Sequence, residues 1–235
     1  MAQRYFLNKN AFEKQLITGE DAHHIIRVMR MKINDQIIVC FDQSCYQAKL
    51  TEINNDVSFE IQEKLEQTKS LDITLIQGLP KGNKIDFVSK YATIYGVSNI
   101  VFTEMQRSIS KEKNTENKIK RLETIAKEAA ELAHRFDVPQ ISFIKNLKLV
   151  NFDQFDMILI ADENEKTKTL NDVITSVDIN KKYALIIGPE GGITDDERVF
   201  FKNLNASFIS LGSNILPTEI ASIYALTYFS LKKCE

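Results

Sequence analysis

The stretch that decides the fold runs from Leu185 to Glu197 and reads LIIGPEGGITDDE. Its apolar start completes the run Tyr183–Ile187, which has the length and composition of a buried strand. The glycine-rich turn Gly188–Gly192 follows, and Thr194 with Glu197 has the spacing of a capping box at a helix start. A buried strand, a tight turn and a helix in this order predict one unit of an α/β domain.

Alternating strands and helices are predicted from residue 71 to residue 235. The predicted helices are Lys84–Tyr95, closed by Gly96, and Lys118–Arg135, with two more after Thr194 and Pro217. The other predicted strands are Ile73–Gln77, Ile100–Thr103, Met157–Ala161 and Ser207–Leu211. Continuous apolar strands between helices indicate a mostly parallel sheet covered on both faces, with ligands bound in the loops that follow the strands.

The first 70 residues have a different pattern, in which short β-rich runs are separated by turn-like residues. These runs are Gln36–Phe41, Tyr46–Ile53 and Val57–Ile61. They predict a small antiparallel barrel or sandwich. The segment Glu20–Met31 interrupts them as a short helix, for which Asp21 is the expected cap. The expected buried side chains of this helix are Ile25, Val28 and Met29.

Composition excludes several classes of protein. With 43% hydrophobic residues, eight Gly and four Pro, the chain is neither disordered nor collagen-like. No apolar run approaches the about 20 residues of a membrane span, and no apolar segment follows Arg4 as in a secretory signal. Thirty basic and 32 acidic residues leave a net charge of −2, so any basic surface is local. The three cysteines form no CxxC pair, and we expect them reduced in the cytoplasm.

The turn Gly188–Gly192 is the first candidate binding loop. It lacks the Lys-Ser/Thr pair of a phosphate-binding P-loop, and Asp195, Asp196 and Glu197 place three carboxylates in the next helical turn. Those carboxylates repel a phosphate at the helix start. The loop therefore favours a neutral or cationic ligand, and the alternative is a tight turn that binds nothing.

The loop after the last strand, Gly212–Glu219, is the second candidate. Ile215 and Leu216 either cover the core or clamp a flat adenine ring, and Glu219 lies at a helix start, where acidic residues commonly balance the helix dipole. The basic loop Pro80–Lys84 is a solvated turn or a phosphate contact.

Metal chemistry is not expected. His23 and His24 are neighbours on a predicted helix and point about 100° apart, which is a poor arrangement for a shared ligand.

Five strings of the chain resemble one family of enzymes. They are HHIIRVMRM (His23–Met31), GLPKGNKIDF (Gly78–Phe87), IAKEAAELAHRFDVPQI (Ile125–Ile141), LIIGPEGGITDDE (Leu185–Glu197) and LGSNILPTEIASIYAL (Leu211–Leu226). The family is the ribosomal RNA small-subunit methyltransferase E family, whose members use S-adenosylmethionine to methylate N3 of a uridine in 16S rRNA. The strings occur in the family's order over almost the whole chain.

The resemblance implies a two-domain α/β protein. Residues 1–70 are expected to form a PUA-like β-barrel that binds RNA, and residues 71–235 a SPOUT methyltransferase domain with a deep trefoil knot near its C-terminus. The implied partners are 16S rRNA in the small ribosomal subunit and a second copy of the chain in a homodimer. No membrane and no metal are implied, and the implied location is the cytoplasm.

The resemblance also assigns roles to residues. The expected contacts of the cofactor S-adenosylmethionine are Ala161, Asp162, Glu163, Gly188, Pro189, Glu190, Gly191, Gly192, Leu211, Gly212, Ile215 and Leu216. The expected catalytic residues are Glu219, which orients the base or accepts its proton, and Arg135 and Arg107, which contact phosphate or the base. The expected RNA-binding residues are Arg4, Arg27, Arg30, Lys32, Lys81 and Lys84.

The chain departs from the family pattern at several positions. Asn214 and Pro217 stand where the family has arginines, Ile220 replaces a threonine, and Leu132 replaces a glutamine. Asn214 and Pro217 motivate one alternative, a catalytically weak RNA-binding or ribosome-assembly protein that keeps the fold. Two others stay open: a SPOUT methyltransferase for another RNA nucleotide, and an enzyme of nucleotide phosphates that uses the loop Gly188–Gly192. The acidic helix start argues against the last.

Overall fold

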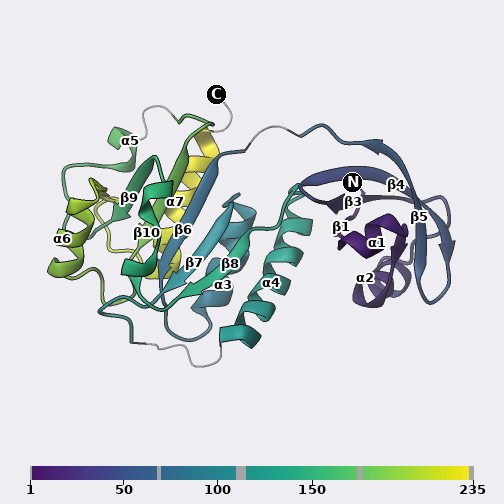
Figure 1. Ribbon diagram of the computed structural model, residues 1–235, viewed down its shortest axis with the longest axis horizontal. Coiled ribbons are helices and arrows are strands. Elements are labelled where there is room, and N and C mark those ends of the chain that lie inside the picture. Colours follow the sequence, from purple (N-terminus) through teal and green to yellow (C-terminus); the bar gives the residue numbers. More distant parts are fainter. Residues whose placement is uncertain (1, 68–69, 110–114, 174–176, 233–235) are drawn as a thin grey trace. The chain divides into compact units, whose positions relative to one another are not determined.

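The chain folds into two compact units in a computed structural model that describes residues 2–67, 70–109, 115–173 and 177–232 (Figure 1). The first unit contains Met1–Thr68 and Ala130–Val138, and the second contains Lys69–Ala129 and Pro139–Glu235. The division after residue 68 lies close to the domain boundary expected at residue 70. The segment Ala130–Val138 groups with the N-terminal unit, although it lies within residues 71–235, which were expected to form the second domain.

The N-terminal unit is built on a five-stranded sheet that curves into a half-barrel, with strand order β1-β3-β4-β5-β2. Its strands are β1 (Arg4–Phe6), β2 (Leu16–Ile17), β3 (Gln36–Phe41), β4 (Ser44–Ile53) and β5 (Val57–Lys64). The three predicted strands are confirmed. The sheet is mixed rather than purely antiparallel, because β1 pairs in parallel with β3.

The short helical segments of this unit differ from the expectation. They are α1 (Lys9–Glu13), α2 (Gly19–His23) and a π-helical turn (His24–Val28). Thr18, not Asp21, is the N-cap residue of α2. Ile25 is buried as expected, but Val28 and Met29 are 60% and 45% exposed. The prediction failed because it applied the α-helical period to a segment that winds with the wider π-helical period.

The hydrophobic core of the N-terminal unit comes from alternate positions of the strands. Ile37 and Val39 of β3 and Val57 and Phe59 of β5 are all buried, as the two-residue period of a strand predicts. Two further facing residues, Cys40 and Cys45, are joined by a disulfide, with Cα atoms 4.1 Å apart. This pairing differs from the reduced cysteines expected from the sequence.

Arg4 corrects one of the RNA-binding expectations. Its side chain is buried, and its Nη1 donates hydrogen bonds to the carbonyl oxygens of His134 and Arg135. Its guanidinium also lies over the ring of Phe136, 4.9 Å from the centroid. A guanidinium enclosed in this way holds the end of a helix and is not available to an RNA backbone.

The C-terminal unit is built on a six-stranded, entirely parallel sheet with strand order β11-β9-β10-β6-β7-β8. Its strands are β6 (Asp72–Gly78), β7 (Asn99–Thr103), β8 (Gln140–Ile144), β9 (Met157–Ala161), β10 (Lys182–Ile187) and β11 (Ser207–Ile209). Its helices are α3 (Lys84–Ile94), α4 (Thr115–Leu132), α5 (Leu170–Val173), α6 (Asp195–Asn203) and α7 (Thr218–Lys232). The predicted parallel sheet is confirmed. Strand β8 was not predicted.

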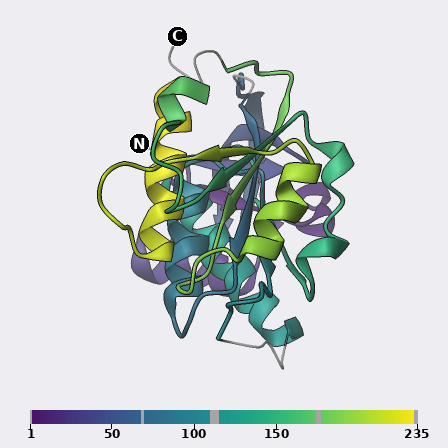
Figure 2. The ribbon, with the colours of Figure 1, turned by 90° about the vertical axis from the view of Figure 1, so that its left-hand side faces the viewer.

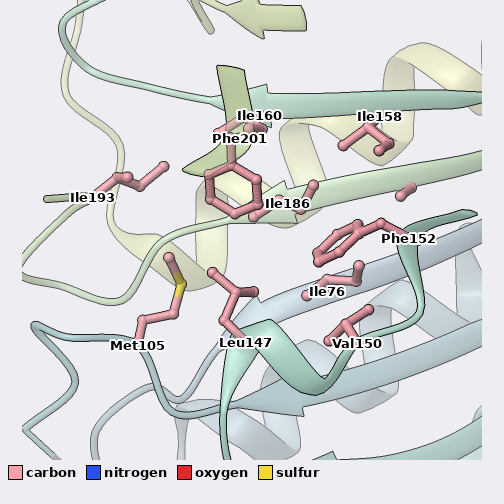
Figure 3. Close-up of a cluster of buried hydrophobic side chains, with 11 residues drawn as sticks. Ile76, Met105, Leu147, Val150, Phe152, Ile158, Ile160, Ile186, Ile193 and Phe201 are labelled. Carbon is pink, nitrogen blue, oxygen red and sulfur yellow. The ribbon is translucent and has the colours of Figure 1, made fainter. Parts of the chain in front are cut away.

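Helices cover both faces of this sheet, as the apolar strands predict. Figure 2 shows α6 and α7 on opposite sides of the strands. The two faces alternate along β10: Ile186 belongs to a core cluster with Phe201 of α6 (Figure 3), whereas the ring of Tyr183 packs edge-on against Phe229 of α7. Since both faces are filled, a ligand of this unit has to bind at the ends of the strands.

The capping box at the start of α6 is also confirmed. Thr194 Oγ1 accepts a hydrogen bond from the backbone N–H of Glu197, and Glu197 Oε2 accepts one from the N–H of Thr194. Within the described residues, no helix is long and apolar enough to cross a membrane.

Candidate functional site

Three loops at the carboxyl ends of neighbouring strands surround a cavity of about 380 Å³ in the C-terminal unit. The loops follow β9, β10 and β11, which lie near one another because β9 pairs with both other strands. All of the residues that the sequence predicts as cofactor contacts line this cavity, except Gly191. Lining residues that were not predicted as cofactor contacts are Lys84, Lys166, Ile187, Ile193, Ser210, Ser213, Asn214, Pro217, Thr218 and Ala221.

The glycines of the loop after β10 allow it to pack closely against its neighbours. A Cβ atom on Gly191 would lie 2.7 Å from Cβ of Arg107, and one on Gly192 would lie 3.1 Å from Oε1 of Glu163. Arg107 Nη1 also donates a 2.9 Å hydrogen bond to the carbonyl oxygen of Gly191. Arg107, an expected catalytic residue, therefore holds the outer side of this loop, while Gly191 packs on Arg107 instead of lining the cavity.

The loop after β9 is held by a buried ion pair. Arg198 of α6 donates from Nε and Nη2 to the two carboxylate oxygens of Asp162, over 2.6 and 2.9 Å. Burial raises the pKa of Asp162, but the hydrogen bonds from Arg198 and from the backbone N–H of Asn164 outweigh it, so the pKa is lowered. The Asp162 carboxylate thus fixes the loop through Arg198. No pattern in the sequence indicated this pairing, because the partners are 36 residues apart.

The loop after β11 is joined to the loop after β10 by a chain of hydrogen bonds. Thr218 Oγ1 donates to the carbonyl oxygen of Gly188 over 2.5 Å and accepts from Nε2 of Gln77 over 2.8 Å. Gln77 is fully buried at the end of β6. A polar residue at the end of an otherwise apolar strand was the one sequence signal for this link. Gly212 has a φ of +116°, which only glycine adopts readily, and no atom of the described residues lies within 4 Å of the position that a Cβ would take.

Lys84 binds two carboxylates beside the cavity. Its Nζ lies 3.1 Å from Oε1 of Glu190 and 3.0 Å from Oε2 of Glu219. The hydrogen bonds that Lys84 donates to Glu219 and to Glu190 raise its pKa and outweigh the lowering by burial. Burial raises the pKa of Glu190, but hydrogen bonds from the backbone N–H of Lys81 and from Lys84 make the net shift downward. Lys84 and Glu190 are therefore charged at neutral pH, and the cluster ties α3 to the loop after β10 and to α7.

The other expected site residues lie elsewhere. Arg135 belongs to the N-terminal unit, where its Nη2 donates to Asp137 over 3.0 Å. The exposed residues Arg27, Arg30 and Lys32 lie in the same unit, at and after the π-helical turn. Lys81 is exposed in the loop after β6, beside the cavity residue Lys84.

The lining of the cavity defines the ligand chemistry. Ile187, Ile215 and Leu216 supply apolar surface for a flat ring, and Glu163 and Glu190 supply carboxylates for a cation. Backbone groups of the glycine-rich loops provide hydrogen bonds for the ring's polar edges. The arrangement suits a ligand that has an apolar part and a cationic part.

Two family models match the chain along almost its full length. An RNA methyltransferase domain matches residues 67–230, and an RNA methyltransferase PUA domain matches residues 17–62. The half-barrel of the N-terminal unit is therefore PUA-like, and the C-terminal unit is an α/β domain of the SPOUT type, as expected.

Curated relatives match over nearly the whole chain. Ribosomal RNA small subunit methyltransferase E of Bacillus subtilis is 33% identical, over 97% of this chain and 96% of the relative. A protein from Borreliella burgdorferi, ribosomal RNA small subunit methyltransferase E 2, is 30% identical, over 95% and 94% of the two chains.

A solved structure is similar over the same length. It is a putative methyltransferase from Legionella pneumophila in complex with the cofactor S-adenosylmethionine, and it is 25% identical with a TM-score of 0.82. The match covers 98% of each chain. From these matches together, the chain belongs to the ribosomal RNA small subunit methyltransferase E family.

Proposed function

We propose that this protein transfers a methyl group from S-adenosylmethionine to N3 of a uridine in 16S rRNA, on the assembled small subunit. The observation that carries the proposal is the cavity formed by the loops after β9, β10 and β11. It gathers residues from three distant parts of the chain that the family resemblance assigns to cofactor binding. The Legionella pneumophila relative, solved with S-adenosylmethionine, supports the choice of ligand.

The residues of the cavity fit this cofactor. The adenine ring would lie against Ile215 and Leu216, and backbone groups of Gly188 and Leu211 would bind its polar edge. The cationic sulfonium and amino groups would lie near Glu163 and Glu190, whose carboxylates line the cavity. The lack of a side chain at Gly212 would leave room for the cofactor, because Gly212 lines the cavity and the space at its Cβ position is open.

When bound, the cofactor supplies a methyl group whose bond to sulfur breaks as a bond to N3 forms, with the electron pair kept by sulfur. The protein has to expose the uracil ring, remove the N3 proton and align N3 with the methyl group. The three fixed loops provide alignment, because ion pairs and hydrogen bonds hold each of them in place. With the cofactor and the uracil bound, the partly apolar cavity would hold little water, which favours a reaction between a cation and an anion.

The N-terminal unit is proposed to bind the rRNA. Arg27, Arg30 and Lys32 are exposed in one short segment of its PUA-like fold, which favours contact with phosphates. Lys81 in the C-terminal unit is the further candidate for a phosphate contact.

We also propose that the protein is a cytoplasmic homodimer and that its C-terminal segments form a trefoil knot. The bridge between Thr169 and Ser210 supports the knot, since it brings the connection after β9 beside the connection after β11.

The proposal is tested by measuring the modification itself. Nucleosides of 16S rRNA from cells with and without the protein are compared by mass spectrometry, and we expect 3-methyluridine to be absent only without it. Purified protein should also incorporate labelled methyl groups into unmodified small subunits. Incorporation into another nucleotide would replace the uridine assignment with one of the alternatives.

One alternative function is supported by two lining residues. Asn214 and Pro217 stand where the family resemblance expects arginines, so the protein could bind RNA and assist ribosome assembly without catalysis. Calorimetry with S-adenosylhomocysteine, with ATP as a comparison, separates the possibilities. Binding of S-adenosylhomocysteine without methyl incorporation supports the assembly role, and binding of ATP alone contradicts both.

A further inference from the structure

The cluster of Lys84, Glu190 and Glu219 contains an asymmetry that the sequence did not reveal. Lys84 and Glu190 line the cavity, whereas Glu219 does not, although Glu219 was the expected catalytic residue. The Lys84 side chain is 35% exposed and that of Glu219 is 19% exposed. A ligand in the cavity therefore meets the ammonium of Lys84, and Glu219 acts on such a ligand through Lys84.

The ammonium of Lys84 keeps at least one donor for a ligand. It carries three N–H groups, and its nitrogen lies 3.1 Å from Oε1 of Glu190 and 3.0 Å from Oε2 of Glu219, so the two carboxylates engage at most two of them. The two carboxylates hold the nitrogen in a fixed position, so a third hydrogen bond requires little rearrangement. Within the described part of the chain, the cationic side chains that line the cavity are Lys84 and Lys166, and Asn214 and Pro217 add no charge.

The reaction proposed above needs a cation at this kind of position. The uridine N3–H is a weak acid, and the ring holds the negative charge on its carbonyl oxygens after the proton leaves. The uracil ring also has to enter the cavity from solvent. Lys84 can contact the entering ring, because the Lys84 side chain is partly exposed. A fixed cation that donates to a carbonyl oxygen makes the N3 proton more acidic.

We propose that Lys84 is the group that contacts the uracil, donating to the carbonyl oxygen that gains negative charge when N3 loses its proton, and that Glu190 and Glu219 position its ammonium. In this step the N3–H bond breaks, its electron pair stays on the ring, and the proton goes to water. The inference rests on the proposed function and changes two assignments: Lys84 moves from phosphate binding to catalysis, and Glu219 becomes a positioning residue.

The charged groups around Lys84 are consistent with this role. Glu190 faces it from the loop after β10 and Glu219 from α7, while Asp86 on its own helix is paired with Arg121. Elsewhere in the lining, the Asp162 carboxylate is bound by Arg198. The two facing carboxylates keep Lys84 protonated, so it acts as a cation and not as a proton acceptor.

The test is the pH profile of single-turnover methylation by the Lys84→Met variant. Removing a cation within about 4–6 Å raises the pKa of an acid by about 1–3 units, so we expect a rate about 10- to 1,000-fold lower near neutral pH. The defect should shrink as the pH rises, because hydroxide then removes the N3 proton without help. Lys84→Arg should recover part of the rate. A defect that is the same at every pH would show that Lys84 has only a structural role.

Two controls separate the roles of neighbouring charges. Lys90→Met removes an exposed lysine from the same helix, away from the cavity lining, and should leave the profile unchanged. Glu219→Gln keeps an oxygen that accepts from Lys84 and should lower the rate less than Lys84→Met. If Glu219→Gln instead abolishes methylation at all pH values, Glu219 is the proton acceptor and the inference is wrong.

A measurement without turnover completes the test. An rRNA fragment that carries 5-fluorouridine at the target position is bound together with S-adenosylhomocysteine, and N3 ionisation is followed by fluorine NMR. Lys84→Met should raise the pKa of N3 in the complex without changing the affinity for S-adenosylhomocysteine. An unchanged pKa, or a loss of S-adenosylhomocysteine affinity, would overturn the inference. If the wild-type protein incorporates no methyl group into rRNA at all, the proposed function fails instead.

Discussion

Asp162 shows how one buried carboxylate can hold a binding loop in place. Its side chain is 4% exposed, and Arg198 binds both of its oxygens from the first turns of α6. A buried charge of this kind is stable only while its partner is present. The loop after β9 therefore depends on a residue in a different element, and the dependence can be measured.

The first prediction concerns this ion pair. Arg198→Met should lower the free energy of unfolding by about 3–5 kcal/mol, because it leaves the Asp162 carboxylate buried and unpaired. Chemical denaturation measures this loss. Arg121→Met is the control, since the Arg121–Asp86 pair is more exposed and should contribute at most about 1 kcal/mol. Equal losses in the two variants would contradict the argument.

The same pair predicts a pH dependence. The folded-state pKa of Asp162 is below its ordinary value of 3.8, so the pair contributes stability above pH 3.8 that is lost as the pH falls through the lower folded-state value. In Arg198→Met, burial alone raises that pKa, and protonation relieves the unpaired charge. The difference in stability between wild type and variant should therefore shrink as the solution is acidified. Denaturation at several pH values between neutral and about pH 3 checks this.

Gly78 provides a prediction about the loop after β10. A Cβ atom at this position would lie 2.6 Å from the backbone nitrogen of Pro189 and 2.9 Å from Sδ of Met105. Gly78→Ala should cost about 1–3 kcal/mol and weaken S-adenosylhomocysteine binding, because the loop has to move away. Gly82→Ala is the control for binding, because it strains the backbone at a φ of +64° but meets no described atom within 4 Å and so does not push on the loop after β10. Calorimetry should show weaker binding only in the first variant.

At the scale of the elements, the last residues after α4 depend on an arginine from β1. Arg4 donates to the carbonyl oxygens of His134 and Arg135, and carbonyl groups at a helix end need donors from outside the helix. The backbone N–H of Phe6 also donates to Oε1 of Glu131 over 3.4 Å. A strand of three residues thus holds the end of a helix that begins more than a hundred residues later.

The prediction is that Arg4 contributes to stability and not to RNA binding. Arg4→Met should lower the free energy of unfolding by about 1–3 kcal/mol, because it removes the guanidinium donor from two carbonyl groups. Arg27→Ala and Lys32→Ala remove exposed charges and should change stability by less than about 0.5 kcal/mol. They should instead reduce the salt dependence of RNA binding, by a slope of about 0.7–0.9 for each phosphate that is no longer neutralised. Measuring both quantities for all three variants checks the assignment.

The elements differ in how far the sequence predicts them. Strands β9 and β10 were predicted because a run of buried apolar residues determines its own structure. Strands β1 and β2 have three residues or fewer and form only because β3 and β5 lie beside them. Hydrophobic periodicity cannot detect such short segments. The turn at His24–Val28 was mispredicted for a related reason, since its winding depends on packing and not on a 3.6-residue period.

The parts of the candidate site also differ in how far the sequence predicts them. Its loops could be located because ligands of a parallel sheet bind at the carboxyl ends of the strands. Most of the expected cofactor contacts line the cavity, but the places of Lys84 and Glu219 could not be predicted, because a pairing between distant helices depends on the final packing. The disulfide between Cys40 and Cys45 could not be predicted either, since it requires the register of β3 against β4.

At the scale of the whole molecule, the N-terminal unit is assembled from two separate parts of the chain. Residues Ala130–Val138 belong to it, although the 61 residues from Lys69 to Ala129 that precede them belong to the other unit. Cys45 also contacts this returning segment, with its Sγ 3.8 Å from the carbonyl oxygen of Phe136. The unit is therefore complete only when the later segment is present.

The prediction is that a fragment of residues 1–70 is less stable than the same unit within the full chain. It lacks the segment that encloses Arg4 and packs beside Cys45, so a buried guanidinium would be left without partners. Hydrogen exchange of the amides in β1 and β3 should be much faster in the fragment than in the full protein. A fragment with the same protection would show that residues 130–138 contribute nothing to this unit.

This two-part assembly has a consequence for biosynthesis. The ribosome finishes residue 68 well before it reaches residue 138, and at about 5–20 residues per second the interval is about 4–14 seconds. During that interval the residues of the half-barrel have been synthesised, but Arg4 still has no carbonyl groups of residues 134 and 135 to bind. The domain proposed to recognise the ribosome's own RNA would thus mature only after much of its neighbour has been translated, which leaves the nascent chain little opportunity to bind RNA prematurely.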